Sequence, residues 1–87
     1  MTQTKKQRDT DPEFDLFKEK IGKTLKKLRE ERGYTNYENF AFENNIARSQ
    51  YGKYERGSED LRLSSLFKVL NSMNISFEEF FKEVTKL

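Results

Sequence analysis

Residues 35–57 of this 87-residue chain, TNYENFAFENNIARSQYGKYERG, decide its fold. Thr35 is followed three residues later by Glu38, which matches a capping box at the start of a helix. Phe40 and Ala41 then fall on the side of that helix that we expect to face inward. The stretch is therefore predicted to open with a short amphipathic helix.

A tight turn is expected at Asn44-Asn45, because asparagine is the non-glycine residue that best tolerates a left-handed backbone conformation. A second short helix is predicted from about Arg48 to Arg56, and Gly57 ends it. Two short helices joined by a tight turn form a helix-turn-helix element.

A helix-turn-helix element requires particular types of residue at particular positions, and residues 35–57 supply them. A small residue must lie where the two helices cross, and Ala41 occupies that place. Four residues on, the turn must accept a left-handed residue, and Asn45 stands there. Ile46, Tyr51 and Tyr54 are spaced to hold the second helix against a core.

A long helix is predicted before this element. It begins at Asp11, an N-cap that is followed by Pro12, and runs to about Arg32, where Gly33 stops it. Gly22 inside this helix is expected to cost about 1 kcal/mol relative to alanine. Residues at spacings of three and four form its predicted inward stripe: Phe14, Phe17, Ile21, Leu25 and Leu28.

Two more helices are predicted after the element, one over about Ser64–Met73 and one from a Ser76 cap to about Glu83, with Asn74 turning the chain between them. Three phenylalanines within five residues of the last helix cannot all point inward, so this segment is a candidate for dimerisation. No alternating strand pattern appears, and the predicted fold class is an all-α five-helix bundle. The apolar stripes of the two helices are Leu66, Phe67, Leu70 and Met73, then Phe77, Phe80, Phe81 and Val84.

Composition excludes several classes of function. The chain has no cysteine and no histidine, which removes disulfides, zinc sites and histidine-based acid–base pairs, so we expect no catalytic residue, no metal and no cofactor. Its net charge of +2 makes the positions of the charges more informative than their sum. No apolar run is long enough to span a membrane and no secretory signal is recognisable, which predicts a cytoplasmic protein. Residues 1–10 are polar and are expected to form a flexible tail, leaving residues 11–87 as one domain.

From residue 21 to residue 81 the chain resembles the phage repressor/Cro-like helix-turn-helix family, the XRE-type transcriptional regulators. The resemblance implies a lambda-repressor-like five-helix bundle that binds double-stranded DNA as a homodimer and regulates transcription, here as a repressor. The carrying motifs, in order, are LKKLREERGY (25–34), FA (40–41), IARSQY (46–51), YERG (54–57) and MNISFEEFF (73–81).

The chain departs from the family's pattern inside the central element. Asn44 stands where the family has a buried leucine, and we expect Phe42 to cover the position that Asn44 leaves. Ala47 replaces the usual Ser or Thr cap of the second helix, at a cost of about 1 kcal/mol.

The first turn of this second helix, the recognition helix, is expected to reach base edges in the major groove. Arg48, Ser49 and Gln50 occupy that turn, and Lys53 lies one turn further along the same face. Arginine pairs bidentately with guanine, glutamine pairs with adenine, and serine bonds to either base. These four are the predicted base-contacting residues, whereas Gly52 either admits the helix deeper into the groove or serves packing.

Phosphate contacts are expected from helix ends and from the loop after the recognition helix. The resemblance also implies an internal ion pair between Arg29 and Glu55 that links the first helix to the recognition helix, so both residues are expected to be structural. The predicted phosphate-contacting residues are Asn36, Tyr37, Arg56, Ser58 and Arg62.

Two alternatives stay open. The first is a protein-interaction module that keeps the bundle without binding DNA, because the second and fifth predicted helices carry glutamates that would repel phosphate. The second is an antitoxin-type component, which would bind DNA and also a protein partner. No motif supports an enzyme.

Overall fold

The computed structural model describes residues 11–87, and these residues form helices without any strand. The all-α prediction with five helices is confirmed for this part of the chain. The predicted tail, residues 1–10, lies outside the described residues. In chain order the helices are α1 (Pro12–Glu31), α2 (Tyr37–Glu43), α3 (Arg48–Arg56), α4 (Leu63–Met73) and α5 (Phe77–Thr85).

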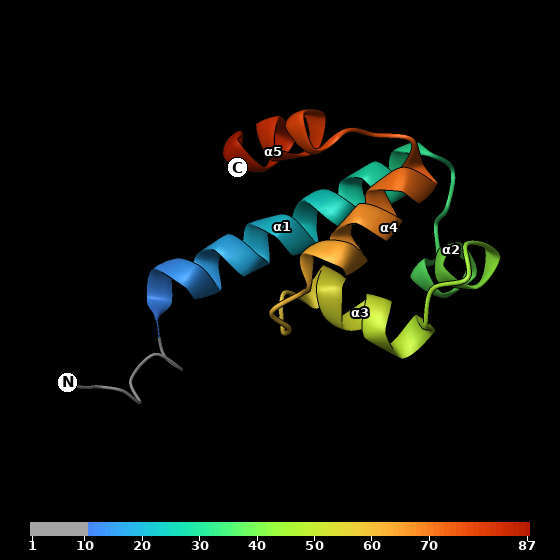
Figure 1. Cartoon of the computed structure of the whole chain (residues 1–87), viewed down its shortest axis with the longest axis horizontal. Coiled ribbons are helices and arrows are strands. Elements are labelled where there is room, and N and C mark those ends of the chain that lie inside the picture. The colour runs from blue at the N-terminus through green and yellow to red at the C-terminus, as the bar shows by residue number, and fades with distance from the viewer. Residues whose placement is uncertain (1–10) are drawn as a thin grey trace.

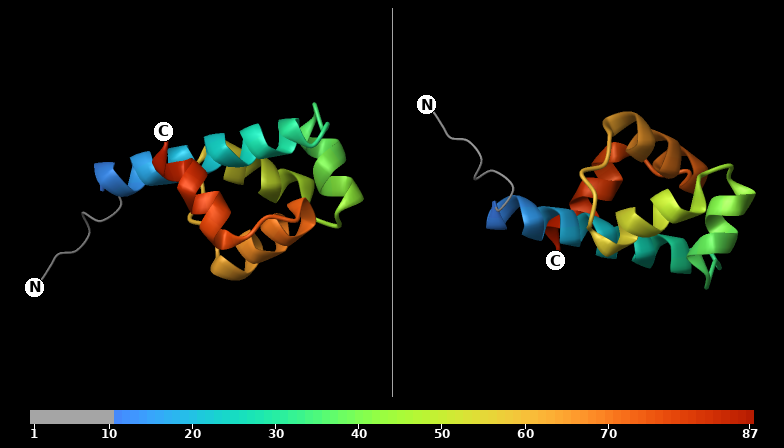
Figure 2. Two further views of the ribbon diagram at one scale, coloured as in Figure 1. Left: turned by 90° about the horizontal axis from the view of Figure 1, so that it is seen from above. Right: turned by 90° about the horizontal axis from the view of Figure 1, so that it is seen from below.

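The long helix α1 is the axis on which the others pack (Figure 1). Helix α3 crosses α1 on one side and α5 lies along another, while α2 closes the end of the bundle near the C-terminus of α1 (Figures 1 and 2). The N-terminal turns of α1 project beyond α3 and α4 (Figure 2). None of the described helices is long and apolar enough to cross a membrane.

The helix ends follow from local side-chain chemistry. Asp11 caps α1 by accepting hydrogen bonds from the backbone N–H groups of Glu13 and Phe14, and Ser76 and Glu79 form a capping box at α5. The predicted capping box of α2 is wrong. Asn36, rather than Thr35, is the N-cap of α2, and its side chain accepts from the backbone at residues 38 and 39.

The turns adopt the backbone conformations that the sequence predicts. Gly57 and Asn74 end α3 and α4 in the left-handed region, with φ of 70° and 58°. Asn45 has φ 57° between α2 and α3. The directions of the short helices are therefore set by residues that tolerate this conformation.

The core lies between α1 and the four other helices, and part of the predicted apolar stripe does not belong to it. Phe14 and Phe17, in the first two turns of α1, are exposed. Phe67 is exposed on α4, where Val69 is buried in addition to the predicted leucines. The buried apolar residues are Ile21, Leu25, Leu28, Phe40, Ala41, Ile46, Tyr51, Tyr54, Leu66, Val69, Leu70, Met73, Phe80 and Val84.

The expectation for Phe42 is also wrong, because its side chain is 71% exposed and covers nothing. Asn44 instead satisfies the end of α2 itself. Its side-chain amide donates a hydrogen bond to the carbonyl oxygen of Phe40 at 2.8 Å. A polar residue at this place is therefore tolerated because it replaces an apolar contact by a helix-end hydrogen bond.

Candidate nucleic-acid interface

Helices α2 and α3 meet at the small residue that the sequence indicates. Ala41 is fully buried, and its carbonyl oxygen accepts a hydrogen bond from the backbone N–H of Ile46 at 2.8 Å. This bond closes the turn around Asn45, so α3 leaves α2 at a fixed angle. Tyr51 and Tyr54 anchor the inner side of α3 in the core.

A buried ion pair fixes α3 to α1. Arg29 Nε donates to Glu55 Oε2 at 2.7 Å and Nη2 donates to Oε1 at 3.0 Å, which is a bidentate pair. Nη1 of Arg29 donates to the carbonyl oxygen of Tyr34 at 2.6 Å, so the same guanidinium also holds the α1–α2 loop. Hydrogen bonding to Glu55 raises the pKa of Arg29 above its ordinary value. The expected Arg29–Glu55 contact is therefore present, with both side chains buried.

The opposite side of α3 faces solvent. Arg48, Ser49 and Lys53 are exposed and Gln50 is half-buried. Within residues 11–87, the side chains of these four make no hydrogen bond or ion pair that would occupy their donors. Ala47 caps α3 without a side-chain hydrogen bond, so the first N–H groups of α3 also lack a side-chain acceptor. This face carries donors suited to base edges and phosphate.

The structure brings part of the predicted contact set together in a shallow hollow between the starts of α2 and α3. Tyr37, Arg48 and Ser49 line it, and so does Glu38, which sequence reasoning did not assign to the site. The Glu38 carboxylate reduces the positive potential of this hollow. Donors from two helices thus lie on one surface.

A second polar hollow includes Gln50. Gln50 and Arg62 line it together with Ser65 and with the acidic residues Glu59 and Asp60. Ser65 was not predicted, because it lies on α4, nine residues after the end of the recognition helix in sequence. This hollow therefore brings Gln50 and Arg62, two predicted contacts, together.

The remaining residues that are predicted to contact phosphate differ in which of their hydrogen-bonding groups are free. Asn36 uses its side-chain oxygen to cap α2, which leaves its amide N–H groups as donors. Ser58 Oγ donates to the carbonyl oxygen of Lys53 at 3.3 Å, so this hydroxyl is partly engaged. Arg56 is exposed and forms no ion pair with another residue of the described part.

Gly52 serves packing rather than a deeper approach to DNA. It is buried, and a β-carbon built on it would lie 2.8 Å from the ring of Tyr37. The half-buried Tyr37 ring covers Gly52 and lies 6.4 Å from the ring of Tyr51. These contacts with α3 therefore position the Tyr37 side chain at the edge of the candidate interface.

Comparisons with known proteins agree on the architecture. A family model described as helix-turn-helix matches residues 25–80. The control protein C.MunI from Mycoplasma sp is 32% identical over 70 residues, which are 80% of this chain and 95% of that protein.

Solved structures give the same result. The restriction-modification controller protein C.Esp1396I, crystallised as a tetramer with its natural 35 base-pair operator, is similar with a TM-score of 0.71 and 28% identity over 80% of this chain and 91% of its own. The controller protein C.AhdI from Aeromonas hydrophila has a TM-score of 0.67 and 31% identity over 74% of this chain and 96% of its own.

Proposed function

This chain belongs to the helix-turn-helix family, and we propose from that premise that it binds duplex DNA sequence-specifically and regulates transcription. Arg48, Ser49, Gln50 and Lys53 of α3 read base edges in the major groove. The phosphate contacts that fix its orientation come from Asn36, Tyr37, Arg56, Ser58 and Arg62.

One observation carries this proposal. The solvent face of α3 presents donors that no other described residue occupies, while its opposite face is held by Tyr51, Tyr54 and the buried Arg29–Glu55 pair. A rigidly held helix with free donors loses little conformational entropy when it binds. A module that had lost DNA binding would have no need for this arrangement.

The similarity to controller proteins supports a more specific role. We place the regulated genes in a restriction–modification system, because a control protein and two controller proteins of known structure match most of this chain. C.Esp1396I is bound to its operator as a tetramer, and we propose that this protein also binds DNA as an oligomer, with the homodimer as its unit. A two-fold dimer then requires half-sites about one helical turn apart, and we assign it the role of a repressor.

Selection of duplex DNA from a random pool at about 0.1 M salt tests the function. We expect enrichment of an inverted repeat, which would give both the operator and the two-fold symmetry of the complex. A second binding measurement uses the DNA upstream of the protein's own gene. Binding without any enrichment, or no binding at all, would contradict sequence-specific regulation and favour the protein-interaction module.

A further inference from the structure

A lysine on α4 donates a hydrogen bond to the turn of the helix-turn-helix. Nζ of Lys68 lies 2.7 Å from the carbonyl oxygen of Asn45, which is 23 residues earlier in the chain. Asn45 is the turn residue with φ 57° between α2 and α3. A hydrogen bond from an ammonium group is stronger than one between two neutral groups. In the described part of the chain, no other hydrogen bond or ion pair joins α4 to α2, to α3 or to the turn between them.

The turn receives this bond where its own residues provide little stabilisation. Helix α2 has no basic residue in its last turn, so the Lys68 ammonium supplies from α4 the positive charge that favours a helix C-terminus. At the start of α3, the N-cap residue Ala47 makes no side-chain hydrogen bond. Lys68 therefore stabilises a turn that lacks a basic residue on one side and a side-chain cap on the other.

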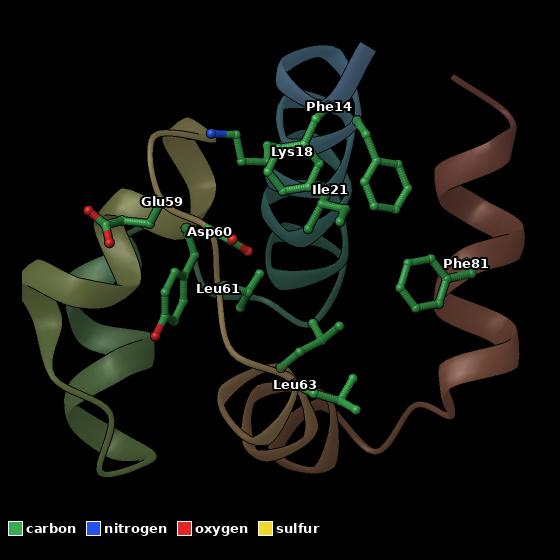
Figure 3. Close-up of a pocket in the computed structure, with 11 residues that line it drawn as sticks. Phe14, Lys18, Ile21, Glu59, Asp60, Leu61, Leu63 and Phe81 are labelled. Atoms are coloured by element: carbon green, nitrogen blue, oxygen red, sulfur yellow. The ribbon is translucent and has the colours of Figure 1, made fainter. Parts of the chain in front are cut away.

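Helix α4 is itself held in place by contacts with α1 and the core. Leu70 is buried on its inner side. At its C-terminal end, Nε of Arg32 in α1 donates to the carbonyl oxygen of Met73 at 2.8 Å. Before its start, Leu61 of the α3–α4 loop and Ile21 of α1 line the same apolar cavity of about 190 Å³ (Figure 3). Helix α4 can therefore serve as a fixed support for the turn.

The start of α3 is not closely packed against α4. A hollow of about 210 Å³ lies between them, and it is lined by Ile46 and Gln50 on one side and by Ser65, Lys68 and Val69 on the other. Gln50 is half-buried and is one of the residues predicted to read a base. Because the hollow separates this part of α3 from α4, side-chain packing there constrains the first turn of α3 only weakly. The bond from Lys68 to the turn adds a constraint at this place.

We propose that Lys68 is a positioning residue for base readout. By holding the carbonyl group of Asn45, it fixes the direction of the first turn of α3 and, with it, the side chain of Gln50. The inference rests on the proposed sequence-specific DNA binding, and it gives α4 a part in base readout without contact with a base. Because the Lys68 ammonium lies on the backbone of the turn, it acts through the turn rather than through a phosphate, and the experiment separates these two roles.

Titrations of the full chain with operator DNA test the role of Lys68 in readout. The measured quantity is the ratio of the affinities for the operator and for an operator in which the base pair read by Gln50 is replaced. Lys68→Met keeps an unbranched side chain and removes the donor and the charge, and we expect it to lower this ratio at least about fivefold. Lys68→Arg, which can also donate to a carbonyl oxygen, should restore the ratio. The control Lys26→Met, at an exposed position of α1, should leave the ratio unchanged.

A double-mutant cycle with Gln50→Ala adds a readout that a merely stabilising role of Lys68 would not change. When Gln50 is replaced by alanine, Lys68→Met should cause no further loss of discrimination at this base pair, because the side chain that it positions is absent. Circular dichroism melts establish that each variant is folded under the conditions of the titration.

Hydrogen exchange of the free protein tests the contact with the turn without DNA. The backbone N–H of Ile46 donates to the carbonyl oxygen of Ala41 and closes the turn. We expect this amide to exchange at least about threefold faster in Lys68→Met than in the wild type, when both rates are compared with that of the Phe80 amide in α5. The comparison with Phe80 removes any effect of global stability.

Three outcomes would overturn the role of Lys68: unchanged exchange of the Ile46 amide, an unchanged affinity ratio in Lys68→Met, or equal losses of discrimination with and without Gln50. A salt slope lowered by about one with unaltered base preference would make Lys68 a phosphate contact and overturn positioning as well. A wild type that binds no duplex DNA, together with faster Ile46 exchange in Lys68→Met, would overturn the proposed function and still support the positioning of α3 by Lys68.

Discussion

Gly22 of α1 lies directly against the backbone of Glu55 in α3. A β-carbon at position 22 would overlap the carbonyl oxygen of Glu55 and would stand 2.8 Å from that of Tyr54. The two helices can approach this closely only because residue 22 has no side chain. The contact sets the place of α3 on α1, and with it the direction in which the donors of α3 point.

Gly22→Ala is expected to destabilise the protein, although alanine is the better helix former by about 1 kcal/mol. The added methyl group meets rigid backbone rather than a flexible side chain, so we expect a net loss of about 2 kcal/mol in the free energy of unfolding. Urea denaturation measures it. Lys26→Ala at an exposed position of the same helix is the control and should change stability by less than about 0.5 kcal/mol. A Gly22→Ala variant as stable as the wild type would contradict this close crossing.

The Arg29–Glu55 pair is expected to act as a unit. Arg29→Ala and Glu55→Ala should each cost about 3–5 kcal/mol, because each leaves a buried charge without its partner. The double variant should cost less than the sum of the two, with a coupling free energy of at least about 1 kcal/mol. Chemical denaturation of the four proteins of the cycle gives this number. Additive losses would mean that the two side chains contribute independently.

Local signals in the sequence predict where the helices start and turn. Asp11, Ser76 and Gly57 act through bonds and conformations within a few residues, so no distant partner is needed to recognise them. Thr35 shows the limit of such signals. The adjacent Asn36 is the N-cap, and asparagine ranks above threonine at this position, so a capping-box spacing alone does not identify the cap.

Periodicity predicts an apolar stripe but not what covers it. Phe14 and Phe17 continue the stripe of α1, yet both rings stay partly exposed, although Phe81 of α5 stacks on Phe17. In the same way, the exposed donors of α3 follow from its pattern alone. The close approaches at Gly22 and Gly52 do not, because the residues that they meet are 15 or more positions away in sequence.

Tyr51 is expected to make stability fall at alkaline pH. Its ring is fully buried, and its hydroxyl has no hydrogen-bond partner among the described residues. Burial raises the pKa of Tyr51 above the ordinary 10.0. The contribution of Tyr51 to the free energy of unfolding is therefore fully present below pH 10. As the pH rises above this value, the free energy of unfolding falls by up to about 1.4 kcal/mol per pH unit.

Tyr51→Phe removes this ionisable group. We expect its free energy of unfolding to fall less steeply than that of the wild type above the ordinary tyrosine pKa of 10.0. Near neutral pH the two proteins should differ by about 1 kcal/mol or less, because the lost hydroxyl has no partner. Denaturant melts over the alkaline range compare the slopes. Parallel slopes would show that Tyr51 is not protonated preferentially in the folded state.

Substitution of a base-contacting residue and substitution of a phosphate-contacting residue should have different effects on DNA binding. Gln50→Ala is expected to lose about 1–3 kcal/mol of discrimination at one base pair, because only Gln50 pairs with that base. Arg56→Ala should weaken binding to all sequences alike and lower the salt slope by about one. Lys82→Ala is the control, because it also removes one positive charge but lies on α5. It should change neither the base preference nor the salt slope. Unchanged base preference in Gln50→Ala would remove this residue from the readout.

Tyr37 combines a packing role with a predicted phosphate contact, and two substitutions separate them. Its ring covers Gly52, and it lines a hollow with Arg48 and Ser49. Tyr37→Phe keeps the ring, so thermal stability should stay within about 0.5 kcal/mol of the wild type. The lost hydroxyl should weaken DNA binding by about 1 kcal/mol, roughly fivefold, without changing sequence preference.

Tyr37→Ala removes the ring as well and uncovers the buried Gly52. We expect a loss of about 2–4 kcal/mol in the free energy of unfolding, because a half-buried aromatic side chain and its contact with Tyr51 are both removed. Denaturation and operator titration are carried out on the same preparations. A Tyr37→Phe variant with unchanged affinity would leave Tyr37 with packing alone, since the hydroxyl is the only group that distinguishes it from the wild type.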